Sequence, residues 1–114
     1  MAAFRSMMRF NPLYPALYLI HRARALFVAR RFQEALSDIQ RATVTLPEHP
    51  NALALLAACY AVLDRENGAR DAVRELRHAS PVYTVGLARR TLPFAKSADL
   101  DLFCELLTKA GLPE

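Results

Sequence analysis

A repeated pattern in the middle of the chain constrains its fold more than any other feature. Counting back from Pro81, residues of matching size stand at fixed offsets, at Ala69, Tyr60, Ala57 and Leu53. The same offsets counted back from Pro47 give Ala35, Leu26, Ala23 and Leu19. The spacing from Pro47 to Pro81 is the repeat period of the chain. A period of about 34 residues is typical of helix–turn–helix repeats, so we predict stacked helical hairpins.

Length and composition support one domain over residues 1–114, and the absence of Asn-Gly or Asp-Gly turns and of apolar/polar alternation predicts the all-α class. The chain is 54% hydrophobic and 23% charged, so it holds enough apolar side chains for a core. Its three glycines and seven prolines are too few for a disordered or collagen-like chain. The prolines lie between the apolar stretches, where they end helices instead of interrupting them.

Apolar spacing and helix-stop signals predict where the helices lie. They are expected at residues 15–29, 32–45, 51–63, 66–79, 84–91 and 98–110. The helix at 51–63 is apolar nearly all round, which predicts neighbours on most of its sides. Ser97 is the expected cap of the last helix, and Gly111 is its expected left-handed stop.

This register resembles the tetratricopeptide repeat, a family of antiparallel helix pairs that stack into a right-handed superhelix. The matching residues are the small places Ala23, Ala57, Ala35 and Ala69, the large places Leu26 and Tyr60, and the terminal prolines Pro47 and Pro81. The chain departs from the pattern at Arg22, where a leucine is usual, and at Leu76, where a second small residue is expected. Arg30 and Asp64 replace the frequent glycine of the inter-helix turn.

The resemblance implies a division of the chain and a class of function. Repeats are expected at 16–49 and 50–83, with a C-terminal helical cap at 84–114 and a truncated preceding repeat at 1–13. Family members serve as protein-interaction or scaffold modules. The resemblance therefore implies binding of a protein or peptide, with no catalysis and no cofactor.

A narrower likeness lies near the two ends of the chain. Residues 92–94, 97–100 and 109–114, together with 11–15, are similar to repeat regions of certain bacterial proteins. In those proteins the repeats follow an adenylate/guanylate cyclase domain or a transcription-regulator domain. The alternative function is thus a regulatory remnant or C-terminal part of such a signalling protein. Cyclase activity does not carry over, because no residue matches the metal-binding aspartates of the cyclase.

The first helix of each pair lines the concave surface in the tetratricopeptide family. By this resemblance, outward-leaning side chains form a groove for a peptide or helix, with Arg24 as a charged anchor. The candidate partner-binding residues are Leu17, Ile20, Arg24, Phe27, Val28, Asn51, Ala54 and Ala58, followed by Ala61 and Val62. A second interpretation stays open, in which these side chains pack on the C-terminal helix or on one another.

Two repeats are fewer than the usual minimum of three, because each unit needs neighbours to cover its faces. The C-terminal helix can close one end of the stack. The other end has only a short apolar segment, and an exposed apolar end favours self-association. We predict a homodimer through the first third of the chain, with the contact residues Phe4, Met7, Met8 and Phe10.

Charge is unevenly distributed along the chain. The net charge is +4, and residues 1–33 contain six arginines and no acid. Such a segment can contact nucleic-acid phosphates, which gives the second alternative function. The acid-rich remainder and the repeat register favour a helical stack over a nucleic-acid reader.

No catalytic or metal-binding pattern stands out. The three histidines lack cysteine or carboxylate partners at ligand spacing, and Cys59 and Cys104 form no motif. We expect no enzyme activity, no metal, and free thiols in a reducing, cytoplasmic setting. No secretory signal is visible at 1–10, and no apolar run reaches the roughly 20 residues of a membrane span. Membrane association is therefore not expected.

Overall fold

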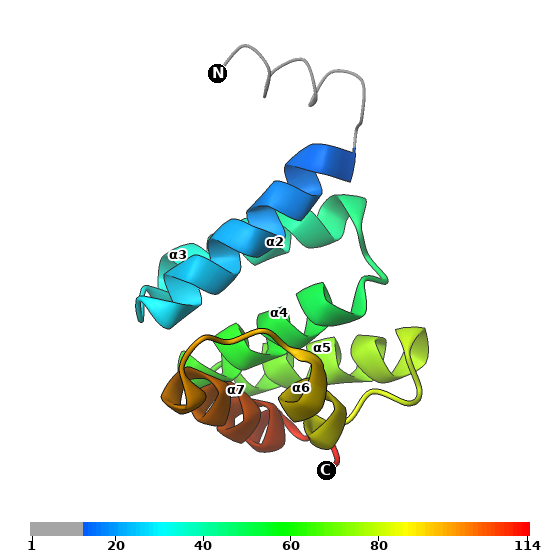
Figure 1. The fold of residues 1–114 in the computed structure, drawn as a ribbon. Coiled ribbons are helices and arrows are strands. Elements are labelled where there is room, and N and C mark those ends of the chain that lie inside the picture. Colours follow the sequence, from blue (N-terminus) through cyan, green and yellow to red (C-terminus); the bar gives the residue numbers. More distant parts are fainter. Residues whose placement is uncertain (1–12) are drawn as a thin grey trace.

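The computed structural model describes residues 13–114, and in this range it contains helices and no strands (Figure 1). The helices are α2 (Leu13–Val28), α3 (Phe32–Thr45), α4 (Pro50–Val62), α5 (Glu66–Ala79), α6 (Val85–Thr91) and α7 (Ser97–Ala110). The all-α class is confirmed. The predicted bounds of α3 and α5 are confirmed to the residue, and the other bounds shift by at most two residues.

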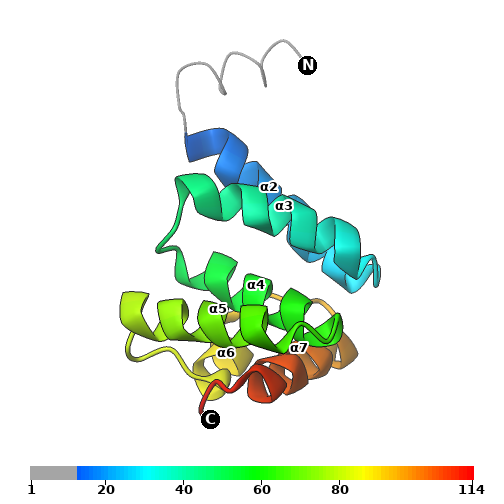
Figure 2. The ribbon, with the colours of Figure 1, turned by 180° about the vertical axis from the view of Figure 1, so that it is seen from behind.

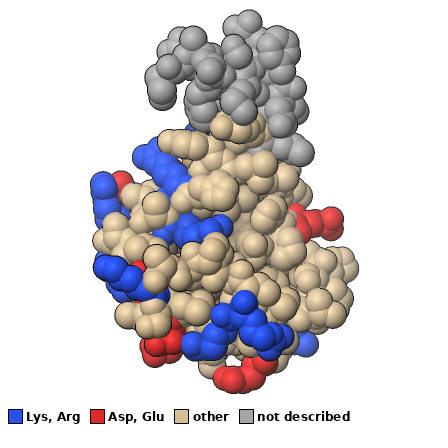
Figure 3. Space-filling view, in the orientation of Figure 1, with Lys and Arg blue, Asp and Glu red and all other residues tan. Residues whose placement is uncertain are grey.

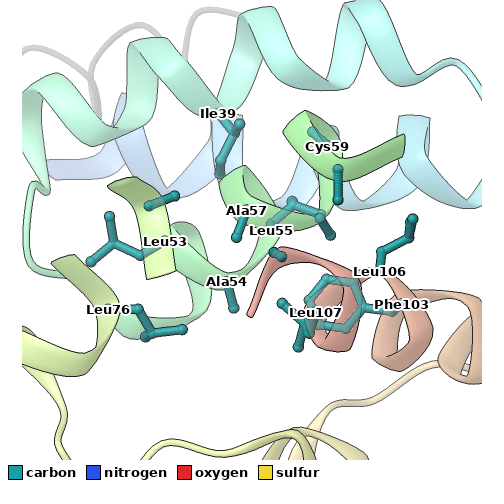
Figure 4. Close-up of a cluster of buried hydrophobic side chains, with 14 of the residues drawn as sticks. Ile39, Leu53, Ala54, Leu55, Ala57, Cys59, Leu76, Phe103, Leu106 and Leu107 are labelled. Atoms are coloured by element: carbon teal, nitrogen blue, oxygen red, sulfur yellow. The ribbon is translucent and has the colours of Figure 1, made fainter. Parts of the chain in front are cut away.

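Helix α4 lies at the centre of the fold, as its apolar surface predicted. It packs against α2, α3, α5 and α7. Figure 4 shows Ala57 of α4 between Ile39 of α3 on one side and Phe103 and Leu107 of α7 on the other, with Leu53 further along the core. All five side chains are buried, and burying one leucine or phenylalanine contributes roughly 1.5–3 kcal/mol.

Two antiparallel hairpins, α2–α3 and α4–α5, carry the same backbone hydrogen bonds at equivalent places of the repeat. After α2, the Arg31 amide donates to the Leu26 carbonyl over 2.8 Å. After α4, the Arg65 amide donates to the Tyr60 carbonyl over 2.9 Å. Figure 2 shows α3 and α5, the second helices of the two hairpins, on the same face of the molecule. The period seen in the sequence is thus a repeat of backbone geometry.

The turn of each hairpin contains one residue with a left-handed backbone. These residues are Arg30, with φ 65°, and Asp64, with φ 58°. Residues other than glycine rarely adopt this backbone conformation, because their Cβ atom comes too close to a backbone carbonyl. Both stand at the turn position where the resemblance described above predicts a glycine. The turn geometry is therefore kept although the residue differs.

The caps differ from two expectations. Helix α7 begins at Ser97, and Lys96 occupies the N-cap position without a side-chain hydrogen bond, so the expected Ser97 cap is wrong. The Lys96 carbonyl already accepts the Asp99 and Leu100 amides, which starts the helix one residue early. His49, to which the sequence analysis assigned no role in a cap, caps α4 through its side chain. Gly111 adopts the predicted left-handed stop, with φ 105°.

Helices α6 and α7 cover the end of the stack opposite α2 and α3 (Figure 1). The Val85 amide donates to the Pro113 carbonyl over 3.0 Å, which ties the start of α6 to the C-terminal residues. None of the described helices is both long and apolar enough to cross a membrane. The predicted dimer contacts Phe4, Met7, Met8 and Phe10 lie outside the described residues.

Candidate protein-binding surface

The predicted groove residues divide into a buried and an accessible set. Buried side chains are Ile20, Phe27, Ala54, Ala58 and Ala61. Accessible side chains are Leu17 and Val28, which are exposed, and Arg24, Asn51 and Val62, which are half-buried. A partner cannot contact the buried set in this structure, so the groove is corrected at those positions.

The C-terminal part of the chain fills the middle of the predicted groove. The ring of Phe27 on α2 lies 5.6 Å from that of Phe103 on α7 and 6.3 Å from that of Phe94. Phe94 follows α6 and lies 5.3 Å from Phe103. Aromatic rings at such separations attract one another beyond the effect of burial. This cluster is the packing that the second interpretation described.

A cleft stays open beside the phenylalanine cluster, between α2 and the segment 93–96 that leads into α7. Its volume is about 390 Å³. Ala25, Val28 and Phe94 give it an apolar lining. His21, Arg24 and Lys96 lie around that lining. We call this site the basic cleft, because these three side chains are the basic groups of its wall.

The charges of the basic cleft are not neutralised within the described residues. None of its three basic side chains forms an ion pair with an acid among residues 13–114. The one acid in the lining is Asp99, which is buried and pairs with Arg30 at 2.9 Å. The cleft therefore keeps the positive charge of Arg24 and Lys96. Figure 3 shows Lys and Arg side chains grouped around the α2–α3 turn, with a further group over α6.

Helix α7 is attached to the inter-helix turns of both hairpins. Asp99 in its first turn pairs with Arg30 of the first hairpin. Lys109 in its last turn donates to the Asp64 carboxylate at 2.8 Å and to the Ala61 carbonyl at 3.1 Å. The hydrogen bond and charge of Lys109 lower the pKa of Asp64. Both ends of α7 are thus fixed, and so is the wall that it gives to the cleft.

In the described part of the basic first third, residues 13–33, three of the four arginines form internal ion pairs. Arg22 pairs with Asp38, Arg30 with Asp99, and Arg31 with Glu34. An arginine that is paired with a carboxylate binds a phosphate group less strongly than an unpaired one. Of the arginines between 13 and 33, this leaves Arg24 without an acidic partner among the described residues.

The buried cysteines and the buried tyrosine are held in their neutral forms. Burial raises the pKa of Cys59 to about 12 and also raises the pKa of Cys104. Burial likewise raises the pKa of Tyr83 to about 12. Only the thiolate is a good nucleophile, so both thiols are inert at neutral pH. Among residues 13–114, no group of three His, Cys, Asp or Glu side chains is arranged to hold a metal ion.

Sequence reasoning missed three residues of this surface. Phe94 and Lys96 lie between the helices predicted at 84–91 and 98–110 and were given no binding role, and His21 was considered only as a metal ligand. The aromatic residue after Pro93 was a usable signal, since an apolar side chain in a break needs a place to pack. Nothing in the sequence showed that this place is α2.

Comparisons with family models, curated proteins and solved structures give no match for this chain.

Proposed function

We propose that the protein is a protein–protein interaction module of the tetratricopeptide type, with two helix pairs in a right-handed superhelix and no catalysis of its own. The observation that carries this proposal is the recurrence of one turn geometry after one repeat period. Non-glycine residues adopt positive φ at the family's glycine place in both turns. Helical stacks of this kind present extended binding surfaces because each unit contacts only its neighbours.

The open surface of α2 supports a binding role. Leu17 is 39% exposed and Val28 is 38% exposed, and both lie on the same helix face as Arg24. A mixed apolar and charged surface beside a cleft is typical of a site that holds a peptide or a helix. We include in the proposal a cytoplasmic, reducing location and self-association through the first third of the chain.

Affinity purification tests the proposed function. The bait is the full chain, and the comparison variants are Arg24→Glu in the cleft and Arg77→Glu on the exposed face of α5. We expect the wild type and Arg77→Glu to retain the same proteins and Arg24→Glu to lose them. Partners unchanged by Arg24→Glu would move the binding surface elsewhere, and no protein above background would contradict the binding function itself.

Sedimentation across a concentration series tests self-association separately. We expect the apparent mass to rise from that of one chain to that of two. A mass of one chain at every concentration contradicts the homodimer and leaves the binding function standing.

A further inference from the structure

We infer that the basic cleft binds an acidic linear segment of a partner protein. The inference rests on the proposed function and adds the place of binding and the chemistry of the partner. It depends on the charges of the cleft, on its apolar lining, on its size and on the rigidity of its walls.

The charges of the cleft favour a negatively charged partner. Arg24 and Lys96 stand on opposite walls, one on α2 and one before α7, and His21 lies one helical turn before Arg24. No acid of the described chain pairs with them. The nearby Asp99 is already neutralised by Arg30. A carboxylate that enters the cleft therefore meets cations on two sides and no unpaired anion.

The apolar lining of the cleft favours a partner that also carries an apolar side chain. Phe94 is half-buried and Val28 is exposed, so both present apolar surface in the cleft that the cations line. An apolar side chain that covers this surface gains roughly 25 cal/mol for each Å² removed from water. The best fit is thus a segment that places an apolar side chain next to aspartate or glutamate.

The size of the cleft favours a linear segment over a folded surface. A volume of about 390 Å³ holds a few side chains, which is the scale of a small-ligand pocket. A folded partner needs a broad contact area of about 800 Å² on each side. An extended segment can insert its side chains into the cleft while the rest of the partner stays outside.

The walls of the cleft are held in place before a partner arrives. Phe94 packs on Phe27 and Phe103, both of which are buried. The ion pair between Arg30 and Asp99 joins the end of the α2–α3 turn to the start of α7. A preformed site loses little conformational entropy on binding, and this improves affinity.

A nucleic acid fits these observations less well than a peptide. Binding to a nucleic-acid strand requires several unpaired Lys or Arg side chains that neutralise successive phosphates. The neighbouring arginines Arg22, Arg30 and Arg31 are paired with acids, so Arg24 and Lys96 do not continue into a row of unpaired cations along the described part of α2 and the α2–α3 turn. The cleft between them also has an apolar lining. This feature favours carboxylates combined with apolar side chains.

Selection from a random peptide display library on the purified full chain tests the inference. We expect the enriched sequences to combine aspartate or glutamate with an apolar residue. For an enriched peptide carrying a fluorescent label, we expect Arg24→Glu with Lys96→Glu to weaken binding about tenfold. Arg77→Glu, an exposed arginine outside the cleft, is the matched control and should bind like the wild type. Lys96→Glu alone keeps the test decisive if the double variant does not fold.

Each other outcome overturns a defined part of the inference. Enrichment of neutral or basic peptides, or no enrichment, contradicts the acidic segment. Acidic peptides that lose affinity in Arg77→Glu but not in the cleft variants place binding on α5, and the proposed function then survives without the cleft. If a labelled single-stranded oligonucleotide binds more tightly than the peptide and loses affinity when Arg24 and Lys96 are changed, the ligand of the cleft is a nucleic acid. If the occupant is a second copy of this chain, the cleft variants will change the mass measured by sedimentation.

Discussion

Helices α2 and α4 end in the same hydrogen-bonded turn, yet the hairpins they begin differ in what they bury. Helix α4 has neighbours on several sides and exposes little of its surface. Helix α2 packs mainly on α3, and its Leu17 and Tyr18 are 39% and 46% exposed. The backbone repeat is therefore independent of burial. The helix spacing sets it, since the turn is the same with Arg30 or Asp64, while the place in the stack decides which side chains must be apolar.

One pair of positions shows this difference most clearly. In the first hairpin, Arg22 faces the buried Asp38, with Nε and Oδ2 3.2 Å apart. The two atoms are not aligned as a hydrogen bond, so Oδ2 is left without one. The equivalent places in the second hairpin hold Leu56 and Ala72. A polar pair is tolerated in the first hairpin because half of the Arg22 side chain stays in water.

The largest expected effect compares Leu53 with its counterpart Leu19. Leu53 is 1% exposed at the centre of the stack, whereas Leu19 is half-buried. Leu53→Ala should lower the free energy of unfolding by about 3 kcal/mol, because it leaves a cavity in a packed core. Leu19→Ala should cost about half as much. Urea denaturation followed by circular dichroism measures both, and equal losses would contradict the asymmetry between the hairpins.

The second effect concerns the ion pair of the first hairpin. Arg22→Leu should lower the free energy of unfolding by about 2 kcal/mol, because it leaves the Asp38 carboxylate buried without a cation. Urea denaturation at neutral pH measures this loss.

The double variant Arg22→Leu with Asp38→Ala copies the second hairpin and is the control. Its stability should lie within about 1 kcal/mol of the wild type or above it, since apolar replacement of a buried ion pair is often neutral. A double variant as unstable as Arg22→Leu alone would show that the first hairpin needs the charges for another reason.

The third effect tests a contact specific to the second hairpin. A Cβ atom added at Gly68 would lie 2.8 Å from the Tyr60 ring. Gly68→Ala should cost about 1–2 kcal/mol, because overpacking outweighs the better helix propensity of alanine.

Glu34 is the counterpart of Gly68 in the first hairpin, and Leu26 is the counterpart of Tyr60. Glu34→Ala should cost no more than about 0.5 kcal/mol, because it removes only the exposed ion pair with Arg31 and adds no atom against a ring. Adding Tyr60→Leu should restore part of the stability lost by Gly68→Ala. No rescue by the smaller side chain would mean that the loss does not come from the ring contact.

The smallest effect is a pH dependence at the start of α4. His49 Nδ1 accepts the Ala52 amide at 3.3 Å, so the cap needs the neutral imidazole, and burial lowers the pKa of His49 below its ordinary value of 6.5. The unfolded chain therefore takes up the proton more readily. The stability from this cap is present above about pH 6.5 and is lost as the pH falls through the lowered pKa.

His49→Asn keeps an N-cap acceptor that does not titrate. Thermal unfolding at pH values on both sides of 6.5 should show a smaller decrease for His49→Asn than for the wild type. Identical decreases would exclude His49 as the source. The counterpart Tyr83 cannot contribute, because its pKa is about 12.

Much of the local structure could be predicted because it depends on neighbours in the chain. The spacing of apolar residues set the bounds of α3 and α5, and Gly111 ended α7. Arg30 and Asp64 were expected in the two turns, but their positive φ values were visible only in the structure. The cap of α7 was misplaced by one residue, because Ser97 is a favoured cap residue and Lys96 is not, yet the Lys96 carbonyl accepts the first helical amides.

The candidate site was predicted only in part. Arg24 and Val28 were expected on an accessible face of α2, and both border the basic cleft. Lys96 and Phe94 were not expected there, because they come from a segment much further along the chain. Side-chain spacing within one helix carries no information about which distant segment packs beside it.

By itself, the sequence determined the helices and their repeat period, because helix formation and turn geometry depend on residues a few places apart. Only the tertiary structure decided that Phe94 and Phe103 fill the surface beside Phe27. It also decided that Asp99 and Lys109 hold α7 to the two turns. These contacts join residues far apart in the chain, and their positions follow from how the helices pack.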